Sequence, residues 1–204
     1  MENTITSEAV SAMSTLPLKT GIVDLWTLST DSLTLADEIR MRALLSDEEL
    51  TVVDKCRRVG ERRSRLLGRA LLRTVLTRYT GISPTLLQFS RSEFGKPALA
   101  DPELGVAFNL SHTDDKVVCA FSRECNLGVD IEHIRYRKEL LNIMDGYMSI
   151  AEKCRITGEP WPKQQKVFFD HWVLKESFVK ATGDGLTQPL DQVEFHKLSG
   201  SQFE

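Results

Sequence analysis

The irregular order of helical and strand patterns is the feature of this sequence that most constrains its fold. Alternation of apolar and polar residues predicts strands at residues 21–28, 87–90, 106–110, 117–121, 127–131 and 192–197. Apolar residues at helical spacing predict one helix after Ser46 and others at residues 62–79, 139–156 and 166–182. Strands and helices do not alternate regularly, which favours an α+β fold over a doubly wound sheet.

Local signals mark where three of these helices begin or end. Ser46 precedes the acidic residues 47–49, as expected of an N-cap followed by an acidic first turn. Gly81 and Gly183 follow periodic segments and are predicted to end the helices there.

The length and composition are those of a globular domain. A chain of 204 residues can bury one substantial core or two small ones without a disulfide or a metal. Its hydrophobic content of 41% and charged content of 27% are ordinary for such proteins. The formal net charge of −3 gives no support to a role in binding nucleic acid.

The cellular location is predicted from the N-terminal residues and the cysteines. No apolar run approaches the ~20 residues that span a bilayer. Residues 1–20 lack the regions of a signal peptide and contain no arginine, so we expect a flexible leader. The four cysteines show no pairing or zinc-binding spacing, which indicates free thiols in a reducing compartment. Together these features predict a cytoplasmic protein that binds no membrane.

Basic residues concentrate in one short stretch of this mildly acidic chain. Between residues 55 and 73 a single acid, Glu61, accompanies eight basic residues: Lys55, Arg57, Arg58, Arg62, Arg63, Arg65, Arg69 and Arg73. The stretch predicts a local anion-binding surface.

Asp130 and Glu132 form the first candidate constellation. Residues two apart in a strand point to the same face, so a strand here places both carboxylates opposite the apolar side chains of residues 127, 129 and 131. Two neighbouring carboxylates suit Mg²⁺ bound together with a phosphate. The alternative is the solvent face of a half-buried strand.

The helix predicted at residues 166–182 supplies the second constellation. Its spacing collects five residues onto one stripe: Trp172, Lys175, Glu176, Val179 and Lys180. An i,i+4 salt bridge between Glu176 and Lys180, worth only ~0.3–0.5 kcal/mol, is the alternative. That alternative accounts for neither the tryptophan nor the second lysine.

Two turns add groups that can bind phosphate. Ser111 and His112 lie where a predicted strand runs into a polar turn, and both can donate to a phosphate. Lys96 is presented by a stiff turn between Gly95 and Pro97. Taken singly, these residues are also compatible with a surface histidine and an ordinary turn.

In this order, these pieces resemble the 4'-phosphopantetheinyl transferase superfamily, in particular its Sfp-type (surfactin-synthetase-activating) branch. The matching strings are FGKPAL at 94–99, FNLSH at 108–112, GVDIE at 128–132 and WVLKESFVKATGDGL at 172–186. KCRR at 55–58 and LLGRALLR at 66–73 are similar to the family's N-terminal helices, and the resemblance covers residues 21 to 194.

The resemblance implies a pseudo-dimer of two similar α+β subdomains, with coenzyme A and Mg²⁺ in the cleft between them. We expect an N-terminal subdomain at residues 21–113 and a C-terminal one at 114–204. Family members normally continue for several strands beyond the position of Glu194, so we expect the second subdomain to be incomplete. A pseudo-dimer also favours a monomeric protein.

The resemblance further implies a role for each matching position. Asp130, Glu132 and Glu176 are expected to bind the metal, while Lys175 and Lys180 meet the diphosphate of coenzyme A. Lys96 and His112 are expected to contact its 3'-phosphate and neighbouring atoms, and Lys55 is expected to add positive charge from the first subdomain. Ser64 stands where the family usually has an arginine, and Arg63 or Arg65 is expected to substitute for it.

The implied activity is the transfer of the 4'-phosphopantetheine group of coenzyme A to a serine of an apo acyl or peptidyl carrier protein. The serine hydroxyl attacks the β-phosphate and 3',5'-ADP leaves. The expected general base is Glu176, or alternatively Glu152 in a string similar to the family's FFxxxE. Which carrier is modified stays open, as does whether the basic stretch serves an acidic carrier or the coenzyme.

Two other functions compete with the transferase. One is a catalytically inert module that binds coenzyme A or a carrier protein. The other is a Mg²⁺-dependent hydrolase of nucleotide diphosphates, which releases phosphopantetheine without any carrier.

Overall fold

The computed structural model describes residues 15–123, 126–135, 140–196 and 198. Residues 1–14 of the expected leader lie outside the described residues. Within its remaining part, Leu18 is only 4% exposed and packs into the first hydrophobic core. Arg123 Nε donates to the Leu18 carbonyl oxygen at 2.9 Å.

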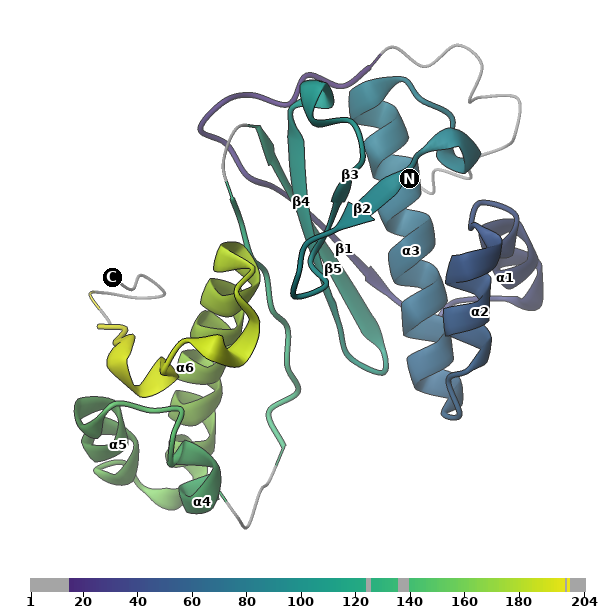
Figure 1. The fold of residues 1–204 in the computed structure, drawn as a ribbon. Coiled ribbons are helices and arrows are strands. Elements are labelled where there is room, and N and C mark those ends of the chain that lie inside the picture. Colours follow the sequence, from purple (N-terminus) through teal and green to yellow (C-terminus); the bar gives the residue numbers. More distant parts are fainter. Residues whose placement is uncertain (1–14, 124–125, 136–139, 197, 199–204) are drawn as a thin grey trace.

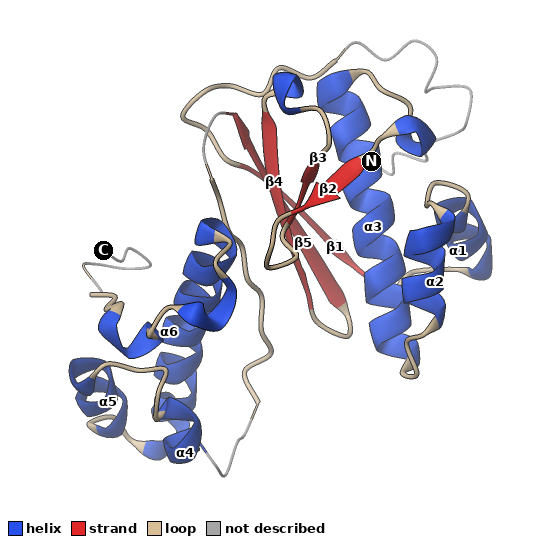
Figure 2. Ribbon diagram, viewed as in Figure 1, coloured by secondary structure: helices blue, strands red, loops and turns tan. Residues whose placement is uncertain are grey.

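The N-terminal part is built on a three-stranded antiparallel sheet in the order β1-β5-β4 (Figure 2). Its strands are β1 (Asp24–Ser29), β4 (Val106–His112) and β5 (Lys116–Arg123). A separate hairpin pairs β2 (Phe89–Arg91) with β3 (Pro97–Leu99). Short 3-10 helices, η2 (Pro84–Leu86) and η3 (Pro102–Leu104), flank this hairpin.

Three helices accompany this sheet, and the longest packs directly on it (Figure 1). They are α1 (Leu35–Arg42), α2 (Asp47–Asp54) and α3 (Val59–Thr80). The predicted cap at Ser46 is confirmed, because its hydroxyl accepts from the main-chain N of Glu49 in a capping box. Gly81 ends α3 with a φ of 74°, a conformation that glycine adopts most readily.

The first hydrophobic core lies between α3 and the sheet. Its most deeply buried members include Leu72, Leu76, Val117 and Phe121, each fully excluded from solvent. Burying each such side chain contributes about 1.5–3 kcal/mol relative to exposure. This core fixes β4, whose C-terminal end carries two of the predicted site residues.

The described residues of the C-terminal part form helices around a second core. They are α4 (Leu140–Met144), α5 (Ile150–Thr157), α6 (Trp161–Thr182), η4 (Gly185–Thr187) and η5 (Leu190–Gln192). Phe168, Phe169, Met148 and Ile156 are among the residues buried in this core. No described helix has both the length and the apolar character needed to cross a membrane.

Two predicted strands are wrong. Residues 127–131 run as an extended linker without a strand ladder, and residues 193–196 follow η5 as coil, while 197 lies outside the described residues. The linker instead bonds to a side chain, since Val129 N donates to Asn109 Oδ1 of β4 at 3.0 Å.

The α+β fold with two subdomains is confirmed, with the sheet in the first part and a helical group around α6 in the second (Figure 1). β5 lies beyond residue 113, where we expected the first subdomain to end, and it pairs with both β1 and β4. We propose residue 123 as the boundary instead.

Candidate active site

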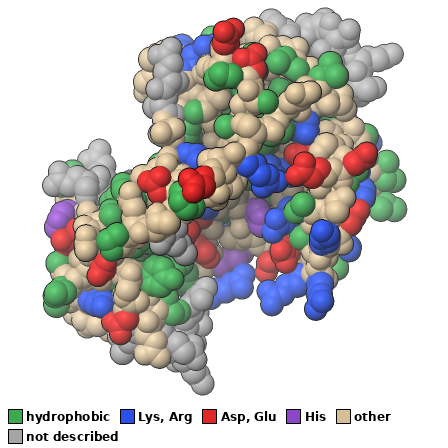
Figure 3. Space-filling view, viewed as in Figure 1, with side chains coloured by type: hydrophobic (Ala, Val, Ile, Leu, Met, Phe, Trp, Pro, Cys, Tyr) green, Lys and Arg blue, Asp and Glu red, His purple; other side chains and the backbone are tan. Residues whose placement is uncertain are grey.

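A pocket of about 360 Å³ lies where the two parts of the chain meet. Three segments contribute three lining residues each: Leu110, Ser111 and His112 from β4; Asp130, Ile131 and Glu132 from the linker; Trp172, Glu176 and Lys180 from α6. Figure 3 shows acidic, basic and histidine side chains gathered around the hollow between the two parts. Six of the predicted site residues are thereby brought together.

The linker is held between β4 and α6. On the side of α6, Gly128 approaches the helix so closely that an added Cβ would lie 1.8 Å from the carbonyl oxygen of Ser177. Further along, His133 Nε2 lies 2.6 Å from Asp115 Oδ1 in the turn after β4. Asp130 is therefore carried by a segment that is fixed on both sides.

A short polar network orders the centre of the pocket. Lys180 Nζ donates to Asp130 Oδ1 at 2.6 Å and to Ser111 Oγ at 3.0 Å. Ser111 Oγ in turn donates to the same Asp130 oxygen at 2.7 Å. The other oxygen, Asp130 Oδ2, is buried without a hydrogen-bond partner among the described residues. A buried carboxylate oxygen in this state is open to a cation or a donor from a ligand.

Glu176 experiences the charge of the other two acids. Burial raises the pKa of its carboxyl group above the ordinary value, and the negative charge of Asp130 raises it further. Lys180 opposes this shift, and Glu132 adds to it. The charges of the other two predicted metal ligands thus reach Glu176.

The donor types in the pocket fit a hard divalent cation, although its described side chains are not gathered into a coordination geometry. Carboxylates are the oxygen ligands that Mg²⁺ prefers, and Asp130 Oδ2 offers an unused one. Across the described part of the chain, no group of three or more His, Cys, Asp or Glu side chains is arranged to hold a metal ion.

His112 connects this pocket to a second, basic one. Burial lowers the pKa of its imidazole, and the positive charges of Arg65 and Lys180 lower it further. Its Nδ1 lies 3.4 Å from the Oγ of Ser64, the residue that stands where the family usually has an arginine. The neutral imidazole is favoured until an anion arrives.

The second pocket has a volume of about 490 Å³ and lies at the start of α3. It is lined by Val52, Lys55, Cys56, Arg57, Arg58, Glu61 and Arg65. Arg65 Nε is buried without a hydrogen-bond partner among the described residues.

Two other arginines of the basic stretch serve the fold. Arg63 points to α1, where its Nε lies 2.7 Å from Glu38 Oε1. Arg73 is 3% exposed and pairs with Glu49 at 2.7 Å. Neither lines either of the two pockets, whereas Arg65 lines the second. Arg65 is therefore better placed than Arg63 to substitute for the family arginine that is missing at Ser64.

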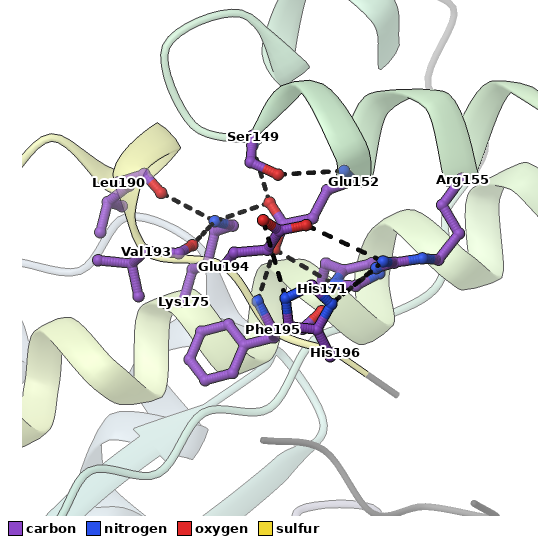
Figure 4. Close-up of polar contacts among 10 residues, drawn as sticks. All are labelled: Ser149, Glu152, Arg155, His171, Lys175, Leu190, Val193, Glu194, Phe195 and His196. Atoms are coloured by element: carbon purple, nitrogen blue, oxygen red, sulfur yellow. Dashed lines mark hydrogen bonds and ion pairs between the residues drawn. The ribbon is translucent and has the colours of Figure 1, made fainter. Parts of the chain in front are cut away.

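Lys175 and Glu152 are not brought to the pocket. They form a buried ion pair, with Lys175 Nζ 2.8 Å from Glu152 Oε2, and their side chains are 1% and 0% exposed (Figure 4). Lys175 Nζ also donates to the carbonyl oxygens of Leu190 and Val193. This lysine therefore ties the segment after α6 to α5 and α6.

The contacts of Glu152 account for its ionised state. Burial alone raises its pKa, but hydrogen bonds from His171, Lys175 and the main-chain N atoms of Ser149 and Phe195 outweigh burial and lower it to about 2. Glu152 also closes a capping box with Ser149 at the start of α5. A carboxylate held in this way is a poor proton acceptor.

The helical repeat explains why the predicted stripe divides. Trp172, Glu176 and Lys180 are spaced by four residues, and all three line the pocket. Lys175 and Val179 each precede one of these residues, which rotates them by about 100° around the helix axis. Both are buried on another face of the helix.

Lys96 also lies away from both pockets. Its Nζ donates to the carbonyl oxygens of Ala181 at 2.8 Å and Leu127 at 3.3 Å. Burial lowers the pKa of this amine. In this structure Lys96 therefore contacts main-chain atoms, and its contact to a phosphate stays a prediction.

Two family models match the chain on either side of residue 125. Residues 26–124 match the model described as 4'-phosphopantetheinyl transferase, N-terminal. Residues 126–204 match the model of the 4'-phosphopantetheinyl transferase superfamily.

Curated relatives agree with these models. The chain is 33% identical over 156 residues to 4'-phosphopantetheinyl transferase HetI of a Nostoc species, covering 76% of this chain and 65% of the relative. It is 35% identical over 142 residues to 4'-phosphopantetheinyl transferase Sfp of Bacillus subtilis, covering 68% and 61%. A further Bacillus subtilis 4'-phosphopantetheinyl transferase is 32% identical over 163 residues, covering 78% and 69%.

The chain thus spans a little under two thirds of the length of HetI and Sfp. The two matched family models, and the relative that is matched over 69% of its length, identify the same family. The chain belongs to the 4'-phosphopantetheinyl transferase superfamily, and it resembles the Sfp type.

Proposed function

We propose that this chain transfers the 4'-phosphopantetheine group of coenzyme A to a serine of an apo carrier protein, releasing 3',5'-ADP. One observation carries the proposal: Asp130, Glu132, Glu176 and Lys180 line a single pocket between the two parts of the chain. Three carboxylates beside a lysine suit a metal-bound diphosphate, since the acids bind the cation and the lysine binds the anion.

We propose that Asp130, Glu132 and Glu176 hold Mg²⁺. When bound, Mg²⁺ neutralises charge on the diphosphate and orients it. The free oxygen of Asp130, and the effect of the Asp130 and Glu132 charges on the pKa of Glu176, support this ligand set.

Lys180 and Ser111 are proposed to orient the diphosphate. Both already meet at Asp130 Oδ1, so their polar atoms converge on one point of the pocket. Transfer of a phosphoryl-type group depends on positioning and on neutralising charge more than on covalent help. An ammonium group at this point stabilises the negative charge that develops on the leaving phosphate in the transition state.

The 3'-phosphate of coenzyme A is proposed to lie towards the second pocket. His112 lines the first pocket, Lys55 and Arg65 line the second, and Arg65 lies near enough to lower the pKa of His112. An arriving phosphate would favour the protonated imidazole and pair with the free Nε of Arg65.

Glu176 is the proposed general base for the serine hydroxyl. Its raised pKa brings the carboxylate closer to the basicity that proton abstraction needs near neutral pH. Glu152, the alternative, is fully buried and is held as a carboxylate by four donors.

The proposed partners are coenzyme A and an acidic carrier protein, with no nucleic acid and no membrane. Lys55, Arg57 and Arg58 are exposed around the second pocket and are available for either partner. We further propose a cytoplasmic, monomeric protein, on the basis of its unpaired cysteine pattern and its two-part fold.

The experiment that tests the proposal is the intact mass of an apo carrier protein after incubation with this chain, Mg²⁺ and coenzyme A. We expect a gain of one phosphopantetheine group, which Asp130→Asn should abolish. Asp145→Asn, which changes an exposed aspartate paired with Lys153, is the matched control and should leave the gain intact.

Three results separate this proposal from its rivals. Binding of coenzyme A with no mass gain across a panel of carriers would make the chain an inert binding module. Release of phosphopantetheine in the absence of any carrier would make it a hydrolase. A full mass gain with Asp130→Asn would remove Asp130 from the active site.

A further inference from the structure

The turn between β2 and β3 reaches the end of α6, in the other part of the chain. Its main chain is fixed by three hydrogen bonds around Ser92. Gly95 N donates to Ser92 O at 2.9 Å, Lys96 N donates to Ser92 Oγ at 3.1 Å, and Ser92 N donates to Lys96 O at 2.9 Å. The backbone that presents Lys96 is therefore ordered independently of the lysine side chain.

The ammonium group of Lys96 satisfies main-chain oxygens of two separate segments. It donates to Ala181 O, in the last turn of α6, and to Leu127 O, at the start of the linker. The last carbonyl groups of a helix have no partner within the helix, and a cation there also complements the helix dipole. Lys96 thus acts as a cap that comes from another part of the fold.

The chain leaving α6 is shaped to receive this turn. Gly183 and Gly185 have φ values of 77° and 64°, which glycine tolerates best. A Cβ at Gly183 would lie 3.1 Å from Lys96 Cδ, and one at Gly185 would lie 3.4 Å from Phe94 Cδ1. Phe94 and Lys96 therefore pack directly against these two glycines.

The two segments joined by Lys96 both carry residues of the pocket. Leu127 precedes Asp130 by three residues, and Ala181 follows Lys180 directly. We propose that Lys96 is a positioning residue: by joining the end of α6 to the linker, it holds Lys180 against Asp130. This role replaces the contact to the 3'-phosphate that the family resemblance implies.

Two observations distinguish this role from direct binding of a phosphate. Lys96 lines neither pocket. Two of the three N–H donors of its ammonium group are already used by carbonyl oxygens, which leaves one for any ligand.

Hydrogen exchange followed by mass spectrometry tests the proposal without relying on activity. Lys96→Met removes the donors while keeping most of the side-chain volume. We expect amide exchange to accelerate by about tenfold or more both in residues 127–131 and in the last turn of α6, because charge-assisted hydrogen bonds are lost there. Lys163→Met, at an exposed lysine paired with Glu159, is the matched control and should change neither segment.

A kinetic measurement adds a second test, which rests on the proposed transferase activity. For Lys96→Met we expect kcat to fall by about ten- to a hundredfold, with KM for coenzyme A changed by less than about twofold. If the unmodified chain transfers no phosphopantetheine, the proposed function fails, and the exchange experiment still decides the role of Lys96.

Lys96→Arg keeps a cation that can donate to both carbonyl groups, and we expect near-normal exchange and kcat from it. It also serves as the deciding variant if Lys96→Met does not fold. The proposal is overturned by unchanged exchange in Lys96→Met, by a raised KM for coenzyme A with unchanged kcat, or by opening of both segments in Lys96→Arg.

Discussion

A methyl group added at Gly128 would separate the linker from α6. The new Cβ of Gly128→Ala would lie 1.8 Å from Ser177 O and 2.6 Å from Ala181 N, both main-chain atoms of the helix. Real Cβ atoms essentially never approach other atoms closer than 3.0 Å, so the two segments must move apart by about 1.2 Å.

This displacement acts on both stability and rate. Overpacking of this kind typically lowers the free energy of unfolding by about 1–3 kcal/mol. Asp130 follows Gly128 by two residues and contacts Lys180 of α6 at 2.6 Å, so the same shift pulls the pocket apart. A misplacement of about 1 Å lowers a rate by about a hundredfold, which is the loss of kcat that we expect.

Urea unfolding and holo-carrier formation together measure these effects. Gly158→Ala is the control, because Gly158 has φ −71° and ψ −13°, which any residue adopts, and its added Cβ would lie 3.1 Å from Cys154 O. We expect the control to change stability by less than about 1 kcal/mol and to keep its activity. Normal stability and normal kcat in Gly128→Ala would refute the close packing of the linker on α6.

Two further substitutions test the charges in and behind the pocket. Glu152→Gln leaves Lys175 buried without its counter-ion and should lower the free energy of unfolding by about 3–5 kcal/mol in urea titrations at pH 7; a loss under about 1 kcal/mol would contradict the buried pair. Because the folded pKa of Glu152 is depressed to about 2, its stabilisation is present above the ordinary value of 4.5 and is lost as pH falls towards 2. Glu176→Gln should abolish transfer yet raise stability at pH 7, because a raised folded pKa penalises the carboxylate. That gain in stability should vanish below pH 4.5, the ordinary pKa of a glutamate. Lower stability of the variant than of the unmodified chain at pH 7 would contradict a raised pKa for Glu176.

Local sequence patterns are sufficient to predict those features that depend on residues close together in the chain. The Ser46 cap follows from hydrogen bonds that span three residues. Glu176 and Lys180 share a face because four residues make about one helical turn, and both line the pocket as expected. Ser111 and His112 sit at the end of β4, where the polar turn places them.

Contacts between distant segments could not be predicted in the same way. Lys175 is next to Glu176 in sequence, but its direction is set by packing against α5 and by carbonyl groups of residues 190 and 193. The linker carrying Asp130 was expected to be a strand, but it bonds to the Asn109 side chain rather than to a strand ladder.

One missed contact did leave a signal in the sequence. Ser149 and Glu152 have the spacing of a capping box, which predicts that this carboxylate bonds to the start of α5. Such a signal argues against a catalytic role for Glu152. The long-range capping of α6 by Lys96 left no comparable local pattern.

That Asp130, Glu132 and Glu176 share one divalent cation is tested most directly by titrating Mn²⁺ and following the free ion by electron paramagnetic resonance, with coenzyme A present. We predict that Asp130→Asn, Glu132→Gln and Glu176→Gln each weaken Mn²⁺ binding on the order of tenfold or more, and that Asp145→Asn leaves it unchanged. Binding as tight as that of the unmodified chain in all three pocket variants would contradict a shared cation site.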